Sequence, residues 1–155
     1  MASTSTSANS NHDVFISHRG VDVKKNLASH LYQRLFSHGI RAFLDQDELV
    51  QGDDLTRQIE CAIRSASVHV AIFSIRYADS AWCLKELVLM QESNSPIIPV
   101  FYGVEPAEVR WIKGTYAQNL EKLKSRYDIT TVEKWRKALA SVPDKSGFEL
   151  KAYNG

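Results

Sequence analysis

The sequence predicts an α/β fold in which helices cover both faces of a mostly parallel sheet. Short apolar, β-branched segments alternate along the chain with longer segments whose apolar residues recur at helical spacing. The apolar segments are nearly continuous rather than alternating with polar residues, which is typical of strands buried on both faces. With 155 residues, 44% of them hydrophobic, the chain is long enough for one such domain with its own core.

The first strand and the first helix are predicted from an apolar run and a helical repeat. The run Val14–Ile16 is short and leads into the polar, glycine-containing segment 17–20, so we expect a buried strand followed by a functional loop. Over residues 22–37 leucines and aromatic residues fall at helical spacing, and Gly39 stands where a helix commonly ends.

The same alternation predicts the elements that follow. In chain order they are a strand over 40–44, a charged loop over 45–52, a helix with Leu55, Ile59, Ala62 and Ile63 on its apolar face, a strand over 68–73, a helix over 79–92, a strand over 96–101, and helices over 115–127 and 131–140. Two prolines in the 96–101 segment indicate an edge strand or strand ends. The pattern does not define a fifth strand.

Composition and motifs exclude several classes of function. A net charge of +1 gives no support for binding to nucleic acid or to a membrane surface through bulk charge, and no run of eighteen apolar residues predicts a membrane span. Patterns typical of zinc proteases, P-loop NTPases, serine hydrolases and Rossmann dinucleotide sites are absent, and no metal site is predicted. Cys61 and Cys83 lie far apart and outside any C-x-x-C pattern, which favours free thiols in a cytoplasmic or nuclear protein.

The segment 77–87 carries the most informative residues of the chain. It predicts the start of a helix on which Trp82 and Glu86, four residues apart, lie on one face, and the surroundings of Glu86 are almost entirely apolar. A flat ring beside a carboxylate could hold a planar, positively charged group. The alternative is a structural glutamate in a surface ion pair with Lys85 or Arg76, and these residues alone leave both interpretations open.

Two polar loops are expected to meet at one edge of the sheet. In open parallel sheets ligands bind beyond the carboxyl ends of the strands, at the point where the strand order reverses, which in a flavodoxin-like order lies between the first and third strands. Residues 17–20 follow the first predicted strand and residues 74–86 follow the third. The sequence therefore predicts a ligand site built from these two segments.

The chain resembles a plant Toll/interleukin-1 receptor (TIR) domain. Five segments carry the resemblance in this order and at this spacing: HDVFISHRGVD, AFLDQDELVQGDDL, VAIFSIRYADSAWCLKEL, IIPVFYGVEPAEVR and EKWRKAL. The resemblance covers residues 12–147 and implies a flavodoxin-like fold with a five-stranded, mostly parallel sheet. Residues 1–11 are expected to be a disordered tail, because they are small and polar, and residues 148–155 a C-terminal tail. No nucleotide-binding or leucine-rich-repeat region follows, so a TIR-only protein or an isolated TIR domain is expected.

The resemblance also implies an activity. TIR domains of this kind break the bond between nicotinamide and ribose in NAD+, giving nicotinamide and ADP-ribose or cyclic ADP-ribose isomers. In plants such products act as immune signals that promote defence and cell death through lipase-like partner proteins. The implied ligand is NAD+ or NADP+ as substrate, with no permanently bound cofactor.

Specific residues take roles by the same resemblance. It implies Glu86 as the catalytic glutamate, Ser80 and Trp82 along the nucleotide pocket, and His18, Arg19 and Gly20 on the opposite wall. The loop 45–52 resembles one that gates the site. Without the resemblance, Trp82 could be a core residue, Arg19 a solvated cation and Gly20 a turn glycine. His18 stands where most relatives have phenylalanine, and it introduces a group that titrates near physiological pH.

Self-association is the last feature that the resemblance implies. Ser29 and His30 match a pair through which plant TIR domains pack helix to helix, and Gly114 matches a second contact. An alternative function is a non-enzymatic adaptor that acts by self-association alone, which would need neither Trp82 nor Glu86. A nuclease or cyclic-nucleotide synthase is a third possibility, and the near-neutral charge gives it little support.

Overall fold

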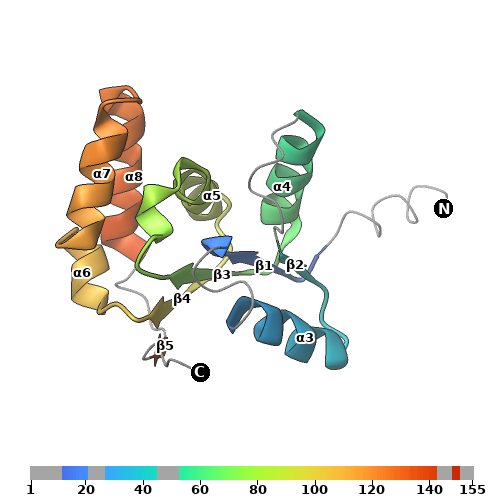
Figure 1. Cartoon of the computed structure of the whole chain (residues 1–155). Coiled ribbons are helices and arrows are strands. Elements are labelled where there is room, and N and C mark those ends of the chain that lie inside the picture. Colours follow the sequence, from blue (N-terminus) through green and yellow to red (C-terminus); the bar gives the residue numbers. More distant parts are fainter. Residues whose placement is uncertain (1–11, 21–26, 45–52, 143–147, 151–155) are drawn as a thin grey trace.

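A sheet of parallel strands lies at the centre of the molecule, with helices above and below it (Figure 1). The structure is a computed structural model, and it describes residues 12–20, 27–44, 53–142 and 148–150. The elements are β1 (Val14–Ser17), α3 (Ser29–Ser37), β2 (Ala42–Leu44), α4 (Asp53–Ser65), β3 (Val68–Phe73), the 3₁₀ turn η2 (Tyr77–Asp79), α5 (Ala81–Glu92), β4 (Ile97–Tyr102), α6 (Pro106–Arg110), α7 (Thr115–Lys124), α8 (Ile129–Ser141) and β5 (Phe148–Leu150).

The strand order confirms the predicted flavodoxin-like topology. Five strands pair in the order β2-β1-β3-β4-β5, and every neighbouring pair is parallel. The chain runs outward from β1 to β2 and returns to β3 on the other side of β1. The strand order therefore reverses between β1 and β3, and the loops that leave these two strands flank the position where such sheets bind ligands.

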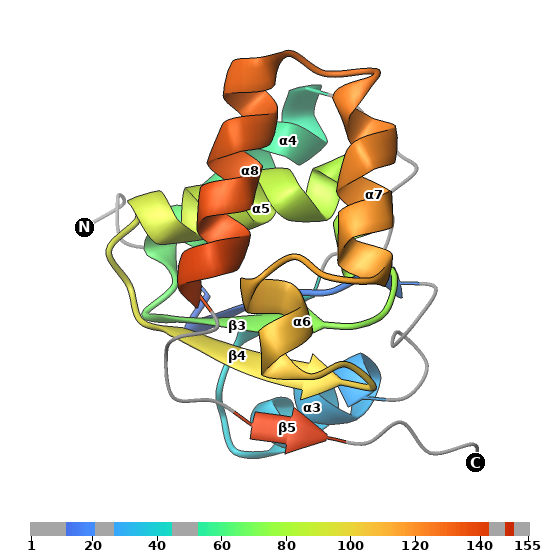
Figure 2. The same ribbon diagram turned by 90° about the vertical axis from the view of Figure 1, so that its left-hand side faces the viewer.

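Alternating strand residues build two core layers on opposite faces of the sheet. Phe15 joins the layer beneath α4, α5 and α8, whereas its neighbour Ile16 joins the layer packed by Leu31 and Leu35 of α3. Figures 1 and 2 show the same division, with α3 on one side of the sheet and α4, α5, α7 and α8 on the other. Helices on both faces explain why the strands are almost uniformly apolar.

Several element boundaries differ from the predicted ones for local reasons. The helix expected over 79–92 begins at Ala81, because the Ser80 hydroxyl caps it by accepting from the Cys83 backbone N–H at 3.1 Å. Gly39, with a φ of 77°, follows α3 as expected. The described part of the first predicted helix starts at residue 27, so its expected start near residue 22 lies outside the described residues, as does the loop 45–52.

The C-terminal third contains two elements that the sequence pattern did not define. A short helix, α6, begins with Pro106 in its first turn, where proline is well tolerated. The fifth strand, β5, pairs with β4 through Val100↔Phe148 and Tyr102↔Leu150, and Figure 2 shows it at the lower edge of the sheet. The sheet therefore extends past residue 147, where we had placed the domain boundary.

Of the two interpretations of the prolines, the edge strand is wrong, whereas the strand end holds for Pro96, which directly precedes β4. β4 is paired on both sides, so it is not an edge strand of the described sheet. Pro99 lies inside β4 opposite Ala71 of β3, and the pairing with β5 begins one residue later, at Val100. At Pro99, β4 pairs with β3 on one side, and the described pairing with β5 on the other side has not yet begun. A residue without a backbone N–H can be tolerated at such a position.

Candidate active site

The candidate site is centred on Glu86, a carboxylate buried inside the first half of α5. Glu86 is only 3% exposed, so the alternative of a surface ion pair with Lys85 or Arg76 is wrong. The Ser17 hydroxyl, at the carboxyl end of β1, donates a hydrogen bond of 2.8 Å to Glu86 Oε1. A buried carboxylate needs such donors, because burial alone disfavours its charged form.

A second hydroxyl extends this contact into the core. The Tyr77 hydroxyl lies 2.7 Å from Ser17 Oγ and 3.3 Å from the Cys83 carbonyl oxygen, so its single proton can go to either acceptor. Burial raises the pKa of Tyr77 well above its usual value, and the nearby Cys83 and Glu86 raise it further. Tyr77 is therefore a neutral hydrogen-bond donor at every physiological pH.

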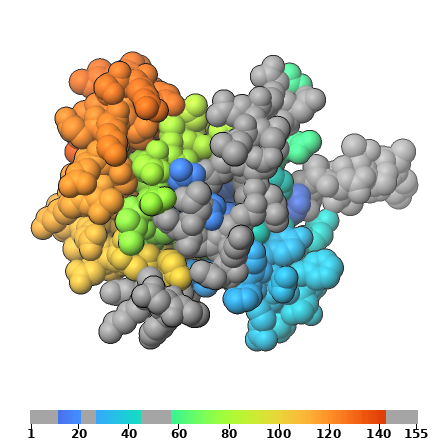
Figure 3. Space-filling model, in the orientation of Figure 1, coloured from blue at the N-terminus to red at the C-terminus, as the bar shows by residue number. Residues whose placement is uncertain are grey.

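The loops after β1 and β3 converge as predicted. Cys83 Sγ donates to the His18 carbonyl at 3.4 Å, which joins the β1 loop to the first turn of α5. In the space-filling view of Figure 3, atoms from the β1 region (blue) and from the segment leading into α5 (green) meet near the centre of one face. His18 is buried, with 3% of its surface exposed, so it is not a solvent-facing imidazole.

An ion pair adds a second link between the same two loops. Arg19 Nε lies 2.9 Å from Asp79 Oδ1, and the two side chains are 25% and 34% exposed. At this exposure the pair contributes little to stability, on the order of 1 kcal/mol or less. Its effect here is to fix the guanidinium near the end of α5 that carries Ser80.

Glu86 and Trp82 open onto the same pocket, as their spacing predicted. The pocket has a volume of about 100 Å³ and is lined by Ile59 and Glu60 of α4 and by Trp82, Lys85, Glu86 and Leu89 of α5. Its volume is well below the roughly 300–1,000 Å³ typical of ligand sites, so it can take one ring of a ligand rather than a whole dinucleotide. Trp82 gives the pocket an aromatic wall, and its two carboxylates outnumber its one ammonium group, which suits a flat cationic ring.

Some of the other predicted residues lie at the site, and others lie on elements that do not line the pocket. Ser80 is buried at the start of α5, and Gly20 lies half-buried after Arg19. Ser29 and His30 lie in the first turn of α3, on the opposite side of the sheet from α5 (Figure 1). The structure therefore does not bring Ser29 and His30 together with the pocket.

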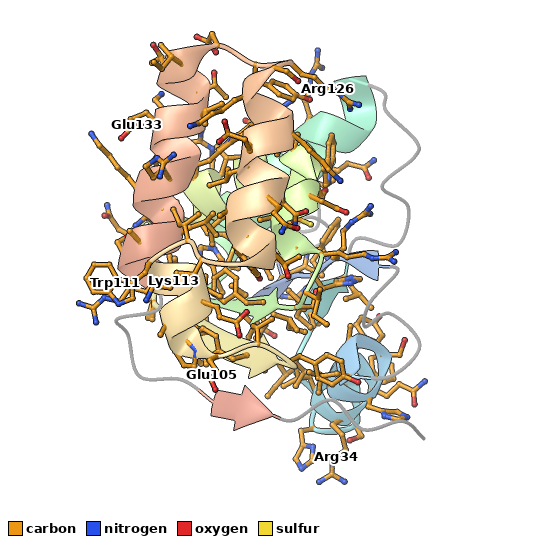
Figure 4. The ribbon with its side chains drawn as sticks, turned by 60° about the vertical axis from the view of Figure 1, so that its left-hand side comes forward. Arg34, Glu105, Trp111, Lys113, Arg126 and Glu133 are labelled. Carbon is orange, nitrogen blue, oxygen red and sulfur yellow. The ribbon has the colours of Figure 1, made fainter. Side chains whose placement is uncertain are left out.

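Gly114 lies at the start of α7. It has a φ of 57°, and a Cβ atom added there would meet nothing within 4 Å, so the position is open to contact but favours glycine. Nearby, Trp111 is 61% exposed and the Arg110 guanidinium lies 4.8 Å from its ring centre. Figure 4 shows Trp111 directed outward from α6, with Lys113 close by.

The sequence does not predict the roles of three residues of the site. Ser17 belongs to the predicted polar loop after the first strand, and no pattern gives Tyr77 a role. Glu60, to which the sequence pattern gives no role, brings a second carboxylate to the pocket beside Glu86. A signal existed for Tyr77, because a buried tyrosine needs a partner for its hydroxyl. Ser17 contacts Tyr77 and Glu86, which lie 60 and 69 residues further along the sequence, so no local pattern predicts these contacts.

Other features of the described chain bear on what the site can do. Among the described residues, no three His, Cys, Asp or Glu side chains are placed to hold a metal ion together. Within the described residues Cys61, which is exposed, and Cys83, which is buried, form no disulfide bond. No described helix combines the length and apolar character needed to cross a membrane.

Comparison with known proteins gives a consistent result at the level of sequence. The TIR domain family profile matches residues 11–154. TMV resistance protein N of Nicotiana glutinosa is 37% identical over 95% of the chain, and the disease resistance-like protein CSA1 of Arabidopsis thaliana is 40% identical over 88% of it. The probable 2′ cyclic ADP-D-ribose synthase BdTIR of Brachypodium distachyon is 48% identical over 64% of it. The chain spans only 13%, 12% and 45% of the lengths of these three proteins.

Comparison of structures agrees. The TIR domains in the activated Roq1 resistosome that recognises the pathogen effector XopQ superpose with a TM-score of 0.80. The sequences are 37% identical, and the match covers 90% of this chain and 88% of that one. Similarity at this level of identity and coverage shows that the two chains share one fold.

Proposed function

Because this chain belongs to the TIR domain family, we propose that it cleaves NAD+ between nicotinamide and ribose, releasing nicotinamide and ADP-ribose or a cyclic ADP-ribose isomer. The single observation that carries the proposal is the buried Glu86 carboxylate opening onto a pocket beside Trp82. The naming of the relative BdTIR as a probable 2′ cyclic ADP-D-ribose synthase supports the same reaction class. NADP+ is an alternative substrate.

The chemistry follows from a carboxylate in an apolar pocket. Nicotinamide leaves as a neutral molecule with the bonding electron pair, and positive charge develops on the ribose as an oxocarbenium-like state. Glu86 stabilises that charge, and its effect is large because the carboxylate is buried. Trp82 offers a flat face to the nicotinamide ring, since cations and planar rings stack well on indole.

The remaining site residues serve binding in this proposal. Ser80 positions the first turn of α5 through its cap and lines the nucleotide path with Trp82. His18, Arg19 and Gly20 form the facing wall, where Arg19 approaches a phosphate of the substrate. Its ion pair with Asp79 holds the guanidinium in place until the substrate arrives.

Self-association completes the proposal. Ser29 and His30 on α3, together with Gly114 before α7, form contacts with other TIR domains. None of these three residues lines the Glu86 pocket. The Roq1 neighbour, whose TIR domains form part of an activated resistosome, supports such assembly. The products would promote plant defence and cell death through lipase-like proteins in the cytoplasm or nucleus.

The experiment measures nicotinamide release from NAD+ by protein concentrated on a crowding surface. Wild type and Glu92→Ala, a matched change at the far end of the same helix, are expected to release nicotinamide. Glu86→Ala is expected to be slower by about a hundredfold or more, the cost of losing a positioned catalytic group. If the assembled wild type releases none, the non-enzymatic adaptor is the better account. If Glu86→Ala matches wild type, the assignment of Glu86 is wrong.

A further inference from the structure

We propose that Ser17 and Tyr77 are positioning residues that orient Glu86 and hold it in its charged form through a directed chain of hydrogen bonds. This inference rests on the proposed function, because it assigns to Glu86 the role of the catalytic carboxylate. It concerns two residues from separate elements, the end of β1 and the turn η2, that meet behind the pocket rather than in it.

The direction of the chain follows from counting protons. Each hydroxyl carries one proton to donate. Ser17 gives its proton to Glu86 Oε1 at 2.8 Å, so at the 2.7 Å contact with Tyr77 it must accept. Tyr77 therefore donates to Ser17, and Ser17 donates to Glu86. Both bonds have ordinary lengths for O–H···O contacts, and each polarises the next in a buried setting.

The chain can also run in reverse, but less well. If Glu86 takes up a proton, it donates to Ser17, Ser17 donates to Tyr77, and Tyr77 turns to the Cys83 carbonyl at 3.3 Å. That last contact is longer than a good O–H···O bond, which is 2.5–3.0 Å. Every hydroxyl still has an acceptor, so the protonated state is reachable, but the hydrogen bonds favour the carboxylate.

The preference of the hydrogen bonds for the charged form of Glu86 opposes the effect of burial. A carboxyl group that is 3% exposed would by desolvation alone favour its neutral form. The proposed reaction needs the charged form while positive charge develops on the ribose. A donor held at 2.8 Å by a second donor behind it favours that form, in addition to any effect of Lys85, which lines the same pocket.

The second half of the reaction uses the reverse direction. After the bond from C1′ to the nicotinamide nitrogen breaks, the oxygen of water or of a ribose hydroxyl forms a bond to C1′ and must lose its proton. Glu86 takes that proton, the chain reverses, and the proton passes to solvent when product leaves. With water, NAD+ and H₂O give nicotinamide, ADP-ribose and one proton.

Other ionisable groups also face Glu86, and the test must hold them constant. Glu60 of α4 and Lys85 line the same pocket. Cys83 lies on the same helix and contacts the His18 segment after β1. On the α8 side of α5, Lys134 lines a separate groove with Lys85. A substitution at Ser17 removes none of these groups, so a change in the Glu86 titration reports the hydrogen bond.

The experiment follows the titration of the Glu86 carboxyl by NMR and, in parallel, the pH profile of nicotinamide release. Ser17→Ala is expected to raise the midpoint of the Glu86 titration by about one pH unit, since it removes a hydrogen bond to the charged form. It should lower kcat about tenfold and move the acidic limb of the rate profile upward, with little change in KM. Ser17→Cys, with a weak S–H donor, should fall between Ala and wild type.

Tyr77→Phe keeps the buried ring and removes only the hydroxyl, so it should act in the same direction as Ser17→Ala but more weakly. Ser93→Ala, at the other end of α5, is the matched control and should leave the titration and the rate unchanged. If the Glu86 midpoint is the same in folded Ser17→Ala or Tyr77→Phe as in wild type, the inference is overturned whatever the activity. If the midpoint moves but the assembled wild type releases no nicotinamide, the hydrogen-bond chain stands and the proposed NAD+ cleavage fails.

Discussion

The helices α5 and α3 lie on opposite faces of the same sheet and place their polar residues in opposite ways. α5 buries five side chains, and one of them is the Glu86 carboxylate. α3 has no buried side chain, and its polar residues, among them His30, face outward while Leu31 and Leu35 touch the sheet. Polar groups buried at a cost in desolvation suit chemistry, whereas exposed ones cost nothing and suit contacts with other proteins.

Core substitutions test the difference in packing, with the largest expected effect on stability. Leu87 of α5 is fully buried, so Leu87→Ala should lower the free energy of unfolding by about 2–5 kcal/mol. Leu35 of α3 is only half-buried, and Leu35→Ala should cost about 1 kcal/mol. Chemical denaturation of the two variants measures both values. Equal losses would show that the two helices are anchored alike.

A surface substitution tests the role of α3. His30→Ala should weaken self-association about tenfold, as expected for losing one good contact at a small interface, and should leave the melting temperature unchanged because His30 is exposed. Sedimentation or light scattering over a concentration series measures the self-association. His38→Ala, at the far end of α3, is the control. Unchanged association of His30→Ala would remove this pair from the proposed interface.

His69, which is buried near the amino end of β3, gives the smallest predicted effect. Burial lowers the pKa of His69 below its usual value of 6.5, although its Nε2 contact of 2.7 Å with the Ile63 carbonyl partly opposes this. A histidine kept neutral in the folded state contributes stability above the unfolded pKa, and this contribution is lost as the pH falls below about 6.5. The free energy of unfolding should therefore drop between pH 7 and pH 5.

The matched variant is His69→Gln, which keeps a donor for the Ile63 carbonyl. It should lose less stability over the same pH interval, because glutamine takes up no proton. Chemical denaturation at the two pH values measures the difference. Identical pH dependence in both proteins would mean that His69 is not desolvated as its position indicates.

Sequence reasoning predicted the fold well wherever the signal was local. The strand over 68–73 and the shared face of Trp82 and Glu86 depend on spacing within one element, and both agree with the structure. The strand β5 was missed because three residues, Phe148–Leu150, with a glutamate between two apolar residues, give too short a pattern.

The site was predicted less completely because its contacts are long-range. Ser17 meets Glu86 only because β1 and β3 pair in parallel, in a register that sets Ser17 opposite Ala71. Glu60 reaches the pocket only because α4 packs against α5. Neither relation leaves a trace in local spacing. Topology alone predicts that the loop after β1 lies near α5, but it does not predict which atoms of the two segments are in contact.

The central claim, that the buried Glu86 drives cleavage of NAD+, is tested most directly by the steady-state kinetics of Glu86→Gln. Glutamine keeps the size of the side chain and removes only its charge, so NAD+ should bind with a similar KM while kcat falls about a hundredfold or more. A variant that releases nicotinamide at the wild-type rate would contradict the account, because the charge of this carboxylate would then have no part in the reaction.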